Sequence, residues 1–260
     1  MEKRNYAKRE RKEYGFWIDF FQRLAIAFVV IPGMKLFYKI NIKGKENIPA
    51  DESFVMAPTH TNYFDPMLAY FATKRPVAFM AKKELFEIWW LRPLIANLGA
   101  FAVNREKLEI ATIKTAQMII NSKSWILALF PQGSRDKAKK ITKLTPGFAY
   151  FARVAKAKVL PISITLHEHK RETLDFITRI QTIFDDTPLF SKLKNTYSTY
   201  EIIIGKPINY SKNLADTMEN WCESIVSIGG YEVDEKIREK IQNEREKEEK
   251  TNNESADSKS

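Results

Sequence analysis

The chain has 260 residues, of which 44% are hydrophobic, so it can bury a full core as one large α/β domain or two small ones. Its 42 Lys and Arg residues outnumber its 32 Asp and Glu residues, and the net charge of +10 favours an anionic partner such as nucleic acid, a membrane surface or a phosphorylated substrate. The single cysteine, Cys222, excludes a disulfide within the chain and a cysteine metal cluster, and it fits a reducing cytoplasmic compartment.

The N-terminal residues 1–36 combine a basic arm with an aromatic, apolar stretch. Residues 2–13 are highly charged, and residues 14–36 are dense in Phe, Trp and Tyr. The longest uncharged apolar run, residues 24–34, is shorter than the ~20 residues that span a bilayer, and no signal-peptide cleavage site follows the basic arm. We expect helices that lie in a membrane interface and break at Pro32-Gly33; a core helix of a soluble domain is the alternative.

From residue 38 onward, short apolar runs alternate with helical patterns. This alternation predicts an α/β fold with a largely parallel central sheet flanked by helices, and we assign residues 37–230 to this domain. The expected strands are residues 38–42, 54–57, 77–80, 101–103, 125–130, 159–165 and 200–204. The expected helices are residues 66–72, 83–98, 107–122, 146–157 and 209–228. In open α/β sheets the site lies outside the carboxyl ends of the strands, where the polar motifs of this chain fall.

The segment APTHTNYFDPM, after the second expected strand, pairs His60 with Asp65. A neutral histidine can take a proton from a hydroxyl near pH 7, and a carboxylate on its other ring nitrogen would fix the tautomer and stabilise the imidazolium. This is the Ser-His-Asp arrangement without the serine, so the substrate's own hydroxyl would be the nucleophile. The alternative is structural, because Asp65 before Pro66 can cap a helix and His60 can be a satisfied histidine at a strand end.

Two further strand ends each carry an arginine. Arg105 follows the strand expected at residues 101–103, and Arg135 ends the segment FPQGSR after the next strand. Arginine presents a planar fork that binds phosphate bidentately, although each arginine alone can equally form an ion pair in solvent. Gly133 allows the backbone to approach a ligand closely, and Ser134 adds a hydroxyl. No dinucleotide, Walker A or nucleophile-elbow pattern is present.

The strand expected at residues 159–165 contains Pro161. A proline removes a hydrogen bond from the strand ladder, so we expect a sheet edge or a bulge here, which could line an apolar groove. His167 and His169 follow at alternate positions and could face the same way. With His60 they are the only histidines, and no third ligand is apparent, so no metal site is expected.

Residues 231–260 form a tail of alternating charges. We expect a solvated helix to about residue 250 and disorder in the last ten residues.

Four of these segments, in this order, resemble the glycerolipid acyltransferase family, of the 1-acylglycerol-3-phosphate (lysophosphatidic acid) acyltransferase type. The resemblance covers roughly residues 35–210. The family's His-x4-Asp motif is matched by His60 and Asp65, its glycine-strand-arginine motif by Gly99, Phe101 and Arg105, its Phe-Pro-Glu-Gly-Thr/Ser-Arg motif by residues 130–135, and its apolar strand with a proline by Pro161.

The resemblance implies transfer of an acyl group from acyl-carrier protein or coenzyme A to the free hydroxyl of 1-acylglycerol 3-phosphate, making phosphatidic acid for phospholipid synthesis. His60 would be the base and Asp65 would orient it, without an acyl-enzyme, a metal or a further cofactor. The residues implied to bind phosphate and glycerol are Arg105, Gln132, Gly133, Ser134 and Arg135, and Pro161 would line the acyl groove or the donor site. The implied location is the cytoplasmic face of a membrane, as a monotopic or peripheral protein on anionic lipid.

One residue departs from the family pattern, because Gln132 stands where the family usually has glutamate. Glutamine cannot carry charge or act as a base, but its amide can hydrogen-bond a glycerol hydroxyl. This change leaves two alternatives open: an acyltransferase for another lysophospholipid, or an inactive relative that binds lipid at the membrane. A nucleic-acid-binding protein has the charge, but the chain lacks an interleaved aromatic and basic motif on any strand, so no nucleic-acid partner is expected.

Overall fold

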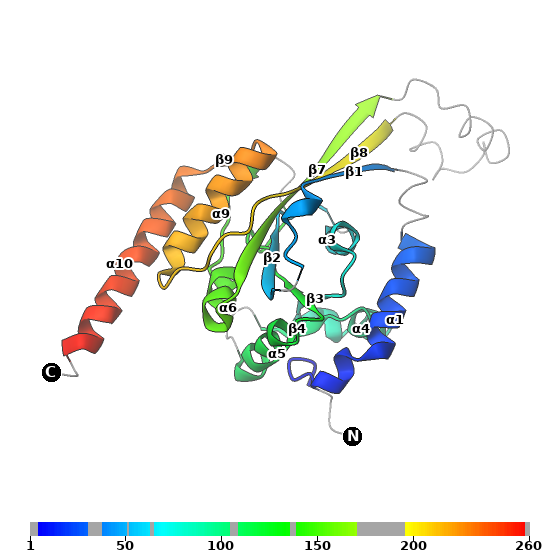
Figure 1. Ribbon diagram of the computed structural model, residues 1–260, viewed down its shortest axis with the longest axis horizontal. Coiled ribbons are helices and arrows are strands. Elements are labelled where there is room, and N and C mark those ends of the chain that lie inside the picture. Colours follow the sequence, from blue (N-terminus) through cyan, green and yellow to red (C-terminus); the bar gives the residue numbers. More distant parts are fainter. Residues whose placement is uncertain are drawn as a thin grey trace.

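The computed structural model describes residues 5–30, 38–50, 52–62, 65–104, 109–135, 139–170 and 196–257. Strands in these residues form a seven-stranded sheet in the spatial order β1-β8-β7-β2-β5-β3-β4 (Figure 1). Its strands are β1 (Tyr38–Lys43), β2 (Phe54–Pro58), β3 (Val77–Lys82), β4 (Phe101–Val103), β5 (Ile126–Ala128), β7 (Lys158–Lys170) and β8 (Thr196–Ile204). All neighbours run parallel except β7 and β8, which are antiparallel. The expected α/β fold is therefore confirmed.

The central strand β2 is buried on both faces. Val55 and Ala57 belong to the core on one side of the sheet, and Phe54 and Met56 to the core on the other. Successive side chains of a strand point to opposite faces, so a strand that is covered on both faces must be apolar at every position. This explains why FVMAP is a continuous apolar run instead of an alternating one.

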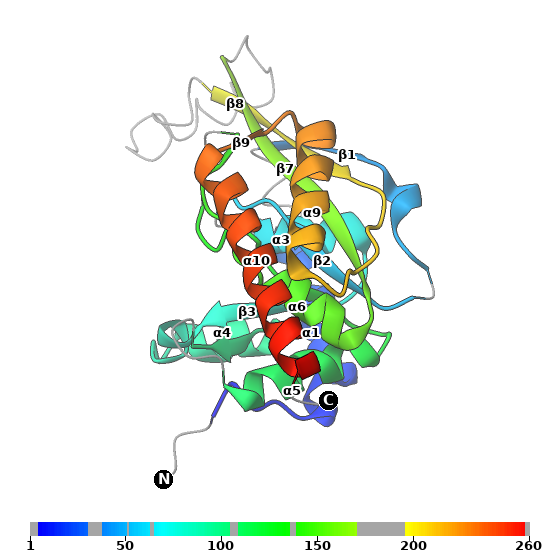
Figure 2. The same cartoon turned by 90° about the vertical axis from the view of Figure 1, so that its left-hand side faces the viewer.

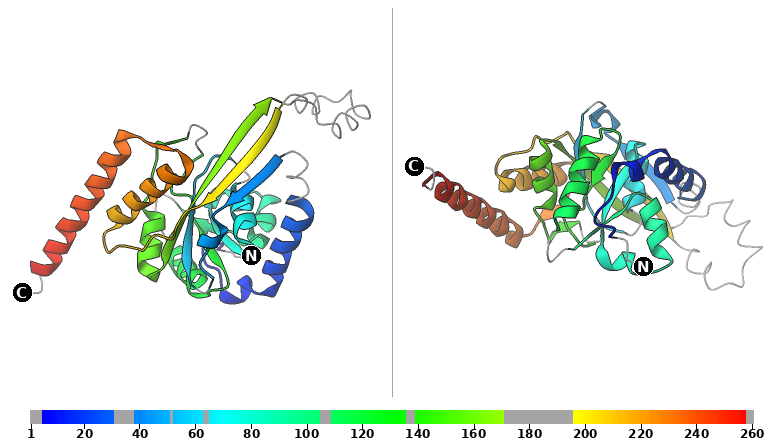
Figure 3. Two further views of the ribbon diagram at one scale, coloured as in Figure 1. Left: turned by 45° about the horizontal axis from the view of Figure 1, so that its top comes forward. Right: turned by 90° about the horizontal axis from the view of Figure 1, so that it is seen from below.

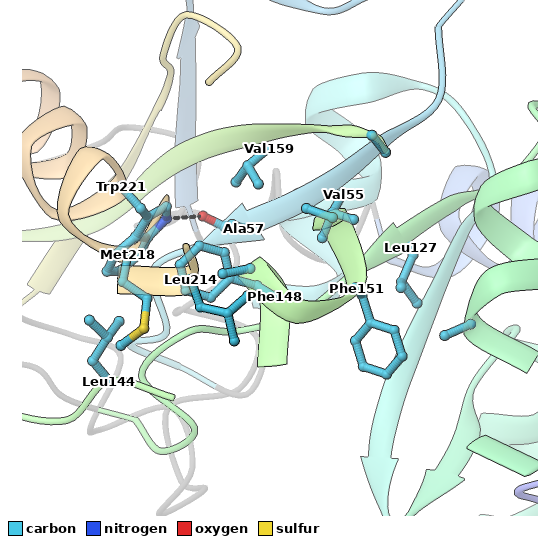
Figure 4. Packing of buried hydrophobic residues seen from close by; sticks show 14 of the residues in the cluster. Val55, Ala57, Leu127, Leu144, Phe148, Phe151, Val159, Leu214, Met218 and Trp221 are labelled. Atoms are coloured by element: carbon cyan, nitrogen blue, oxygen red, sulfur yellow. Dashed lines mark hydrogen bonds between the residues drawn. The ribbon is translucent and has the colours of Figure 1, made fainter. Parts of the chain in front are cut away.

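Helices cover both faces of this sheet (Figures 1 and 2). They are α1 (Phe16–Ala25), α3 (Asp65–Thr73), α4 (Leu91–Asn97), α5 (Ile110–Asn121), α6 (Gly147–Ala155), α9 (Leu214–Gly229) and α10 (Glu235–Asp257). In the core between the sheet and helices α6 and α9, Trp221 packs on Phe148 and donates its indole N–H to the carbonyl oxygen of Ala57 at 2.9 Å (Figure 4). This bond anchors α9 at the end of β2, three residues before His60.

The N-terminal segment is attached to the domain by buried polar side chains. The guanidinium of Arg9 donates to the carbonyl oxygens of Ala96 and Ala100 at 3.3 and 3.2 Å. Gln22 of α1 bonds both backbone groups of Val77, at 2.7 and 2.9 Å. Arg9, which the sequence places in a basic arm, is thus a buried residue that fixes the chain to the sheet.

The outer side of α1 is aromatic and exposed, and a π-helical turn (Ile26–Val30) continues it. The exposed side chains are Phe16, Trp17, Phe20, Phe21, Leu24 and Phe28. The expected break at Pro32-Gly33 lies outside the described residues. Among the described residues, no helix has the length and apolar character that a membrane crossing requires.

The helix expected at residues 83–98 is two elements: a 3-10 turn (Lys83–Phe86) and α4. Pro93 is the reason, because proline has no N–H to donate within a helix and is tolerated only in its first turn, which is where it lies in α4. Between the two elements, Trp89 and Trp90 are 78% and 58% exposed. The exposed apolar surface of α1 therefore has a counterpart beside α4.

Pro161 lies in the middle of the sheet, so the expectation of an edge strand is wrong. The N–H groups on either side of it find partners, since Val159 pairs with Ile208 and Ile162 pairs with Ile204. The interval from Val159 to Ile162 on β7 is three residues long, but the interval from Ile204 to Ile208 that pairs with it is four residues long. This mismatch is of the β-bulge type, and it leaves no ladder position that would need an N–H from the proline. The alternative expectation, a bulge at Pro161, describes this arrangement.

The C-terminal helix α10 runs beside α9 and continues to Asp257, further than expected (Figure 2). Ile237 and Ile241 are buried in the core that contains Trp221, so one side of this charged helix is packed and not solvated. Arg245 pairs with Asp216 and Glu219 of α9 at 3.1 and 2.7 Å. Helix α10 and the β7–β8 hairpin extend from opposite ends of the molecule (Figure 3).

Candidate active site

The carboxyl end of β2 and the start of α3 bring His60 and Asp65 into contact. The Nδ1 atom of His60 lies 2.8 Å from Oδ2 of Asp65, and the His60 side chain is 18% exposed whereas Asp65 is fully buried. With the proton on Nδ1 shared toward the carboxylate, Nε2 carries the lone pair that can accept a proton. The ring of His60 stacks on Phe130 with centroids 4.1 Å apart, which fixes the plane of the imidazole.

The Asp65 carboxylate accepts hydrogen bonds from two backbone N–H groups. Oδ2 accepts the N–H groups of Thr61 and Asn62, each at 2.6 Å, in addition to the imidazole. Hydrogen bonds of this kind stabilise a buried charge that burial alone would disfavour. The structural and the catalytic interpretation of Asp65 are therefore compatible, since the same oxygen organises the loop before α3 and orients His60.

Gln132 joins the loop after β5 to His60. Its Oε1 accepts the backbone N–H of His60 at 2.7 Å, and the side chain is only 2% exposed. Its Nε2 is buried and has no hydrogen-bond partner in the described part of the chain. The carbonyl half of the amide therefore positions the histidine, while the predicted contact of Gln132 with a glycerol hydroxyl would fall to the NH2 half.

The rest of this loop forms a tight turn at the same edge of the sheet. Gly133 has φ +66°, a left-handed conformation that favours glycine, and its N–H donates to the carbonyl oxygen of Phe130 at 2.9 Å. Ser134 is half-buried and Arg135 is exposed. Because β5 is the parallel neighbour of β2, the loop and His60 lie side by side. Arg105 lies outside the described residues, so its expected role in phosphate binding stays a prediction.

The remaining candidates lie on strand β7. Pro161 is buried in β7 opposite Ala57. Its ring packs against Gly205, because a Cβ atom added to this glycine would lie only 2.9 Å from Cγ of Pro161. His167 on the β7–β8 hairpin pairs with Glu201 at 3.3 Å. No cluster of three His, Cys, Asp or Glu side chains suited to a metal occurs among the described residues.

Sequence reasoning missed two residues next to this site. Thr59 directly precedes His60, and its hydroxyl accepts the N–H of Ile164 at 2.8 Å. The phenol of Tyr231, 172 positions later in the chain, lies 3.2 Å from the same Thr59 oxygen. Nothing in the segment IGGYEVD marks this tyrosine, because the contact exists only once the sheet has assembled.

Part of the chain is similar to a known protein family. Residues 39–165 match the family model described as Acyltransferase, and this stretch contains His60, Asp65 and the Gln132 loop. The resemblance of the four motifs to acyltransferases is thus confirmed over this stretch, which is just under half of the chain.

Individual relatives carry a more specific name. The chain is 33% identical over 120 residues to the 1-acyl-sn-glycerol-3-phosphate acyltransferase of Streptococcus pneumoniae, covering 44% of this chain and 42% of that protein. It is 32% identical over 123 residues to the Bacillus subtilis protein of the same name, covering 47% and 60%. The chain thus spans about half the length of these curated relatives. A crystal structure of the 1-acyl-sn-glycerophosphate acyltransferase of Thermotoga maritima aligns over 80% of this chain and 78% of that one, with 18% identity and a TM-score of 0.49.

Proposed function

We propose that the protein transfers an acyl group from an acyl-carrier-protein or coenzyme A thioester to the free hydroxyl of 1-acylglycerol 3-phosphate, which yields phosphatidic acid. The observation that carries this proposal is the 2.8 Å contact between His60 Nδ1 and the buried Asp65 carboxylate at the edge of an acyltransferase domain. No serine or cysteine nucleophile is required, because the acceptor lipid supplies the attacking oxygen.

In the first step, His60 Nε2 accepts the proton of the lysolipid hydroxyl while the oxygen attacks the thioester carbon. Asp65 stabilises the imidazolium that forms, as in other His-Asp pairs. The tetrahedral intermediate then expels the thiolate, which takes the proton back from His60, so that the products are an ester and a free thiol. General base catalysis of this kind contributes about 10²–10⁴-fold.

The turn at Gly133 restricts how the oxyanion of the intermediate can be bound. The N–H of Gly133 already donates to the carbonyl oxygen of Phe130 at 2.9 Å, so it is not directed at the oxyanion. The exposed Arg135 guanidinium stands at the same loop, where a phosphate on the acceptor can reach it from solvent. We assign Arg135, with the predicted Arg105, to the acceptor phosphate.

The location that suits this reaction is the cytoplasmic face of an anionic membrane, with peripheral or monotopic attachment. Its support is the row of exposed aromatic side chains on α1 together with Trp89 and Trp90 near α4. Exposed aromatic residues of this kind favour the membrane–water interface, and the net charge of +10 favours anionic lipid. Helix α1 contacts α4, so the two groups lie on one part of the molecule (Figure 1).

The test is transfer of a radiolabelled acyl group to lysophosphatidic acid by the purified protein. We expect phosphatidic acid from the wild type and a loss of at least about 10²-fold in kcat with His60→Ala. His167→Ala removes a histidine that pairs with Glu201 away from the site, and it should leave the rate unchanged. Undiminished turnover by His60→Ala would reject the proposed base.

The same assay separates the alternatives that Gln132 leaves open. A matrix of acyl-carrier-protein and coenzyme A donors against several lysophospholipids identifies the donor and the headgroup. Vesicle binding without turnover of any lysolipid would favour an inactive lipid-binding relative. Salt-sensitive binding of oligonucleotides without lipid affinity would favour a nucleic-acid-binding protein instead.

A further inference from the structure

A short C-terminal segment contacts both the residue before His60 and the segment that follows the Gln132 loop. This segment, residues 229–234, which we call the strap, joins α9 to α10 and contains strand β9 (Glu232–Val233). It lies outside the stretch that matches the acyltransferase family model.

On one side, the strap closes a buried network at the residue before His60. The phenol oxygen of Tyr231 lies 3.2 Å from Oγ1 of Thr59 and 3.1 Å from the carbonyl oxygen of Ile164. Thr59 is itself bonded to β7 twice through its backbone and side chain, since its N–H donates to Ile162 at 2.9 Å and its Oγ1 accepts from Ile164 at 2.8 Å. Both Tyr231 and Thr59 are buried, so water does not compete for these bonds.

On the other side, the strap holds the segment that follows the Gln132 loop. Strand β9 pairs with β6 (Lys140–Ile141), and the N–H of Glu232 donates to the carbonyl oxygen of Lys139 at 2.9 Å. The ammonium of Lys140 pairs with Asp234 at 2.9 Å. The same segment continues to Thr145, whose N–H donates to the carbonyl oxygen of Pro131 at 2.8 Å, directly before Gln132.

The two sides converge on His60. Thr59 fixes the backbone before the histidine, and Gln132 accepts the N–H of the histidine itself. We propose that Tyr231 is a positioning residue for acyl transfer, which acts through Thr59 to hold His60 in the orientation that the reaction needs. This inference rests on the proposed function, in which His60 is the base.

The expected signature is a change in rate more than in affinity. The Tyr231 phenol contacts Thr59 and the carbonyl oxygen of Ile164, so its hydroxyl should act on the placement of the base and not on the binding of the acceptor. Misplacement of a catalytic group by about 1 Å can slow a reaction about 10²-fold. We expect Tyr231→Phe to lower kcat about tenfold and to leave KM for both substrates within about twofold.

The experiment compares hydroxyl-deleting variants with matched controls. Thr59→Val should lower kcat at least as much as Tyr231→Phe, whereas Thr59→Ser, which keeps the hydroxyl, should restore most of the rate. The double variant Thr59→Val/Tyr231→Phe should be no slower than Thr59→Val alone, because both changes break one network. Tyr150→Phe on α6 removes a phenol away from the network and serves as the control. A wild-type kcat in Tyr231→Phe, or effects that multiply in the double variant, would overturn the proposal.

A measurement without substrate keeps this test separate from the proposed function. Nitrogen-15 NMR of the imidazoles, with the His60 signals assigned from a His60→Asn variant, reports the environment of His60 in each protein. Tyr231→Phe should shift or broaden the His60 signals, and Tyr150→Phe should not. If the wild type transfers no acyl group to any lysolipid, the proposed function fails, and this NMR comparison alone decides: altered His60 signals support positioning by Tyr231, and unaltered signals reject it.

Discussion

At the scale of single residues, Gln132 shows why a glutamine can replace the usual glutamate. The atom that it binds is the backbone N–H of His60, at 2.7 Å, and an amide carbonyl accepts such a bond as a carboxylate does. The substitution therefore preserves the position of the histidine while it removes a negative charge beside the site. The difference between the two residues lies in the other half of the side chain, where an NH2 donor replaces an acceptor.

Two variants separate these contributions. Gln132→Leu leaves the buried N–H of His60 without its acceptor, so we expect the free energy of unfolding to fall by about 1–3 kcal/mol and kcat to fall about tenfold or more. Gln132→Glu keeps the acceptor, so the rate should stay closer to wild type while preference among lysolipid headgroups changes. Urea unfolding and the acyl-transfer assay check both. Full activity in Gln132→Leu would show that this contact does not position His60.

At the scale of elements, α1 has two sides with different roles. Its inner side is attached to the sheet through Gln22, and its outer side exposes aromatic residues. Deleting residues 1–36 would therefore remove Arg9 and Tyr14 from the core as well as the exposed surface, and it would not isolate membrane binding. Substitutions on the outer side are the sharper experiment.

We expect Phe16→Ser/Trp17→Ser, and separately Trp89→Ser/Trp90→Ser, each to weaken binding to anionic vesicles at least about tenfold, because burial of one large apolar side chain contributes about 1.5–3 kcal/mol. Ile110→Ser on α5 changes a residue that is also 71% exposed, and it should have no effect. Vesicle sedimentation measures binding, and circular dichroism confirms that each variant is folded. Equal losses in all three proteins would indicate a nonspecific effect of apolar surface.

At the scale of the whole molecule, local patterns predicted the elements better than their arrangement. The sequence predicted the buried strand β2, the strand at residues 38–42 and the loops that carry His60 and Gln132. Each of these depends on residues that are close together in the chain. The pairing of β1 with β8, the central position of Pro161 and the packing of Ile237 and Ile241 depend on contacts between distant segments. For the site, the His60–Asp65 contact was predictable from its spacing, whereas Tyr231 was not.

Cys222 offers a test of how cooperatively this arrangement unfolds. It is buried in the core between the sheet and α9, and burial raises the pKa of its thiol to about 12. The thiol should therefore react with a disulfide reagent at pH 8 only in molecules whose core has opened.

The raised pKa also predicts how the free energy of unfolding depends on pH. The contribution of Cys222 to this free energy is present below pH 9.0, the ordinary pKa of a thiol, and it is lost as the pH rises toward 12. Fast labelling of the native protein at pH 8 would contradict this account.

The strap also bears on how the protein is made. His60 and Asp65 leave the ribosome almost together, but Tyr231 follows Thr59 by 172 residues. At about 5–20 residues per second, the nascent chain carries the pair for roughly ten to thirty seconds before the tyrosine is synthesised. Strand β1 waits for β8 in the same way, since their register joins Tyr38 to Ser198. Until β8 is synthesised, β1 and one edge of β7 are open to a chaperone or to another nascent chain, and the final geometry of His60 is reached only after Tyr231 has been synthesised.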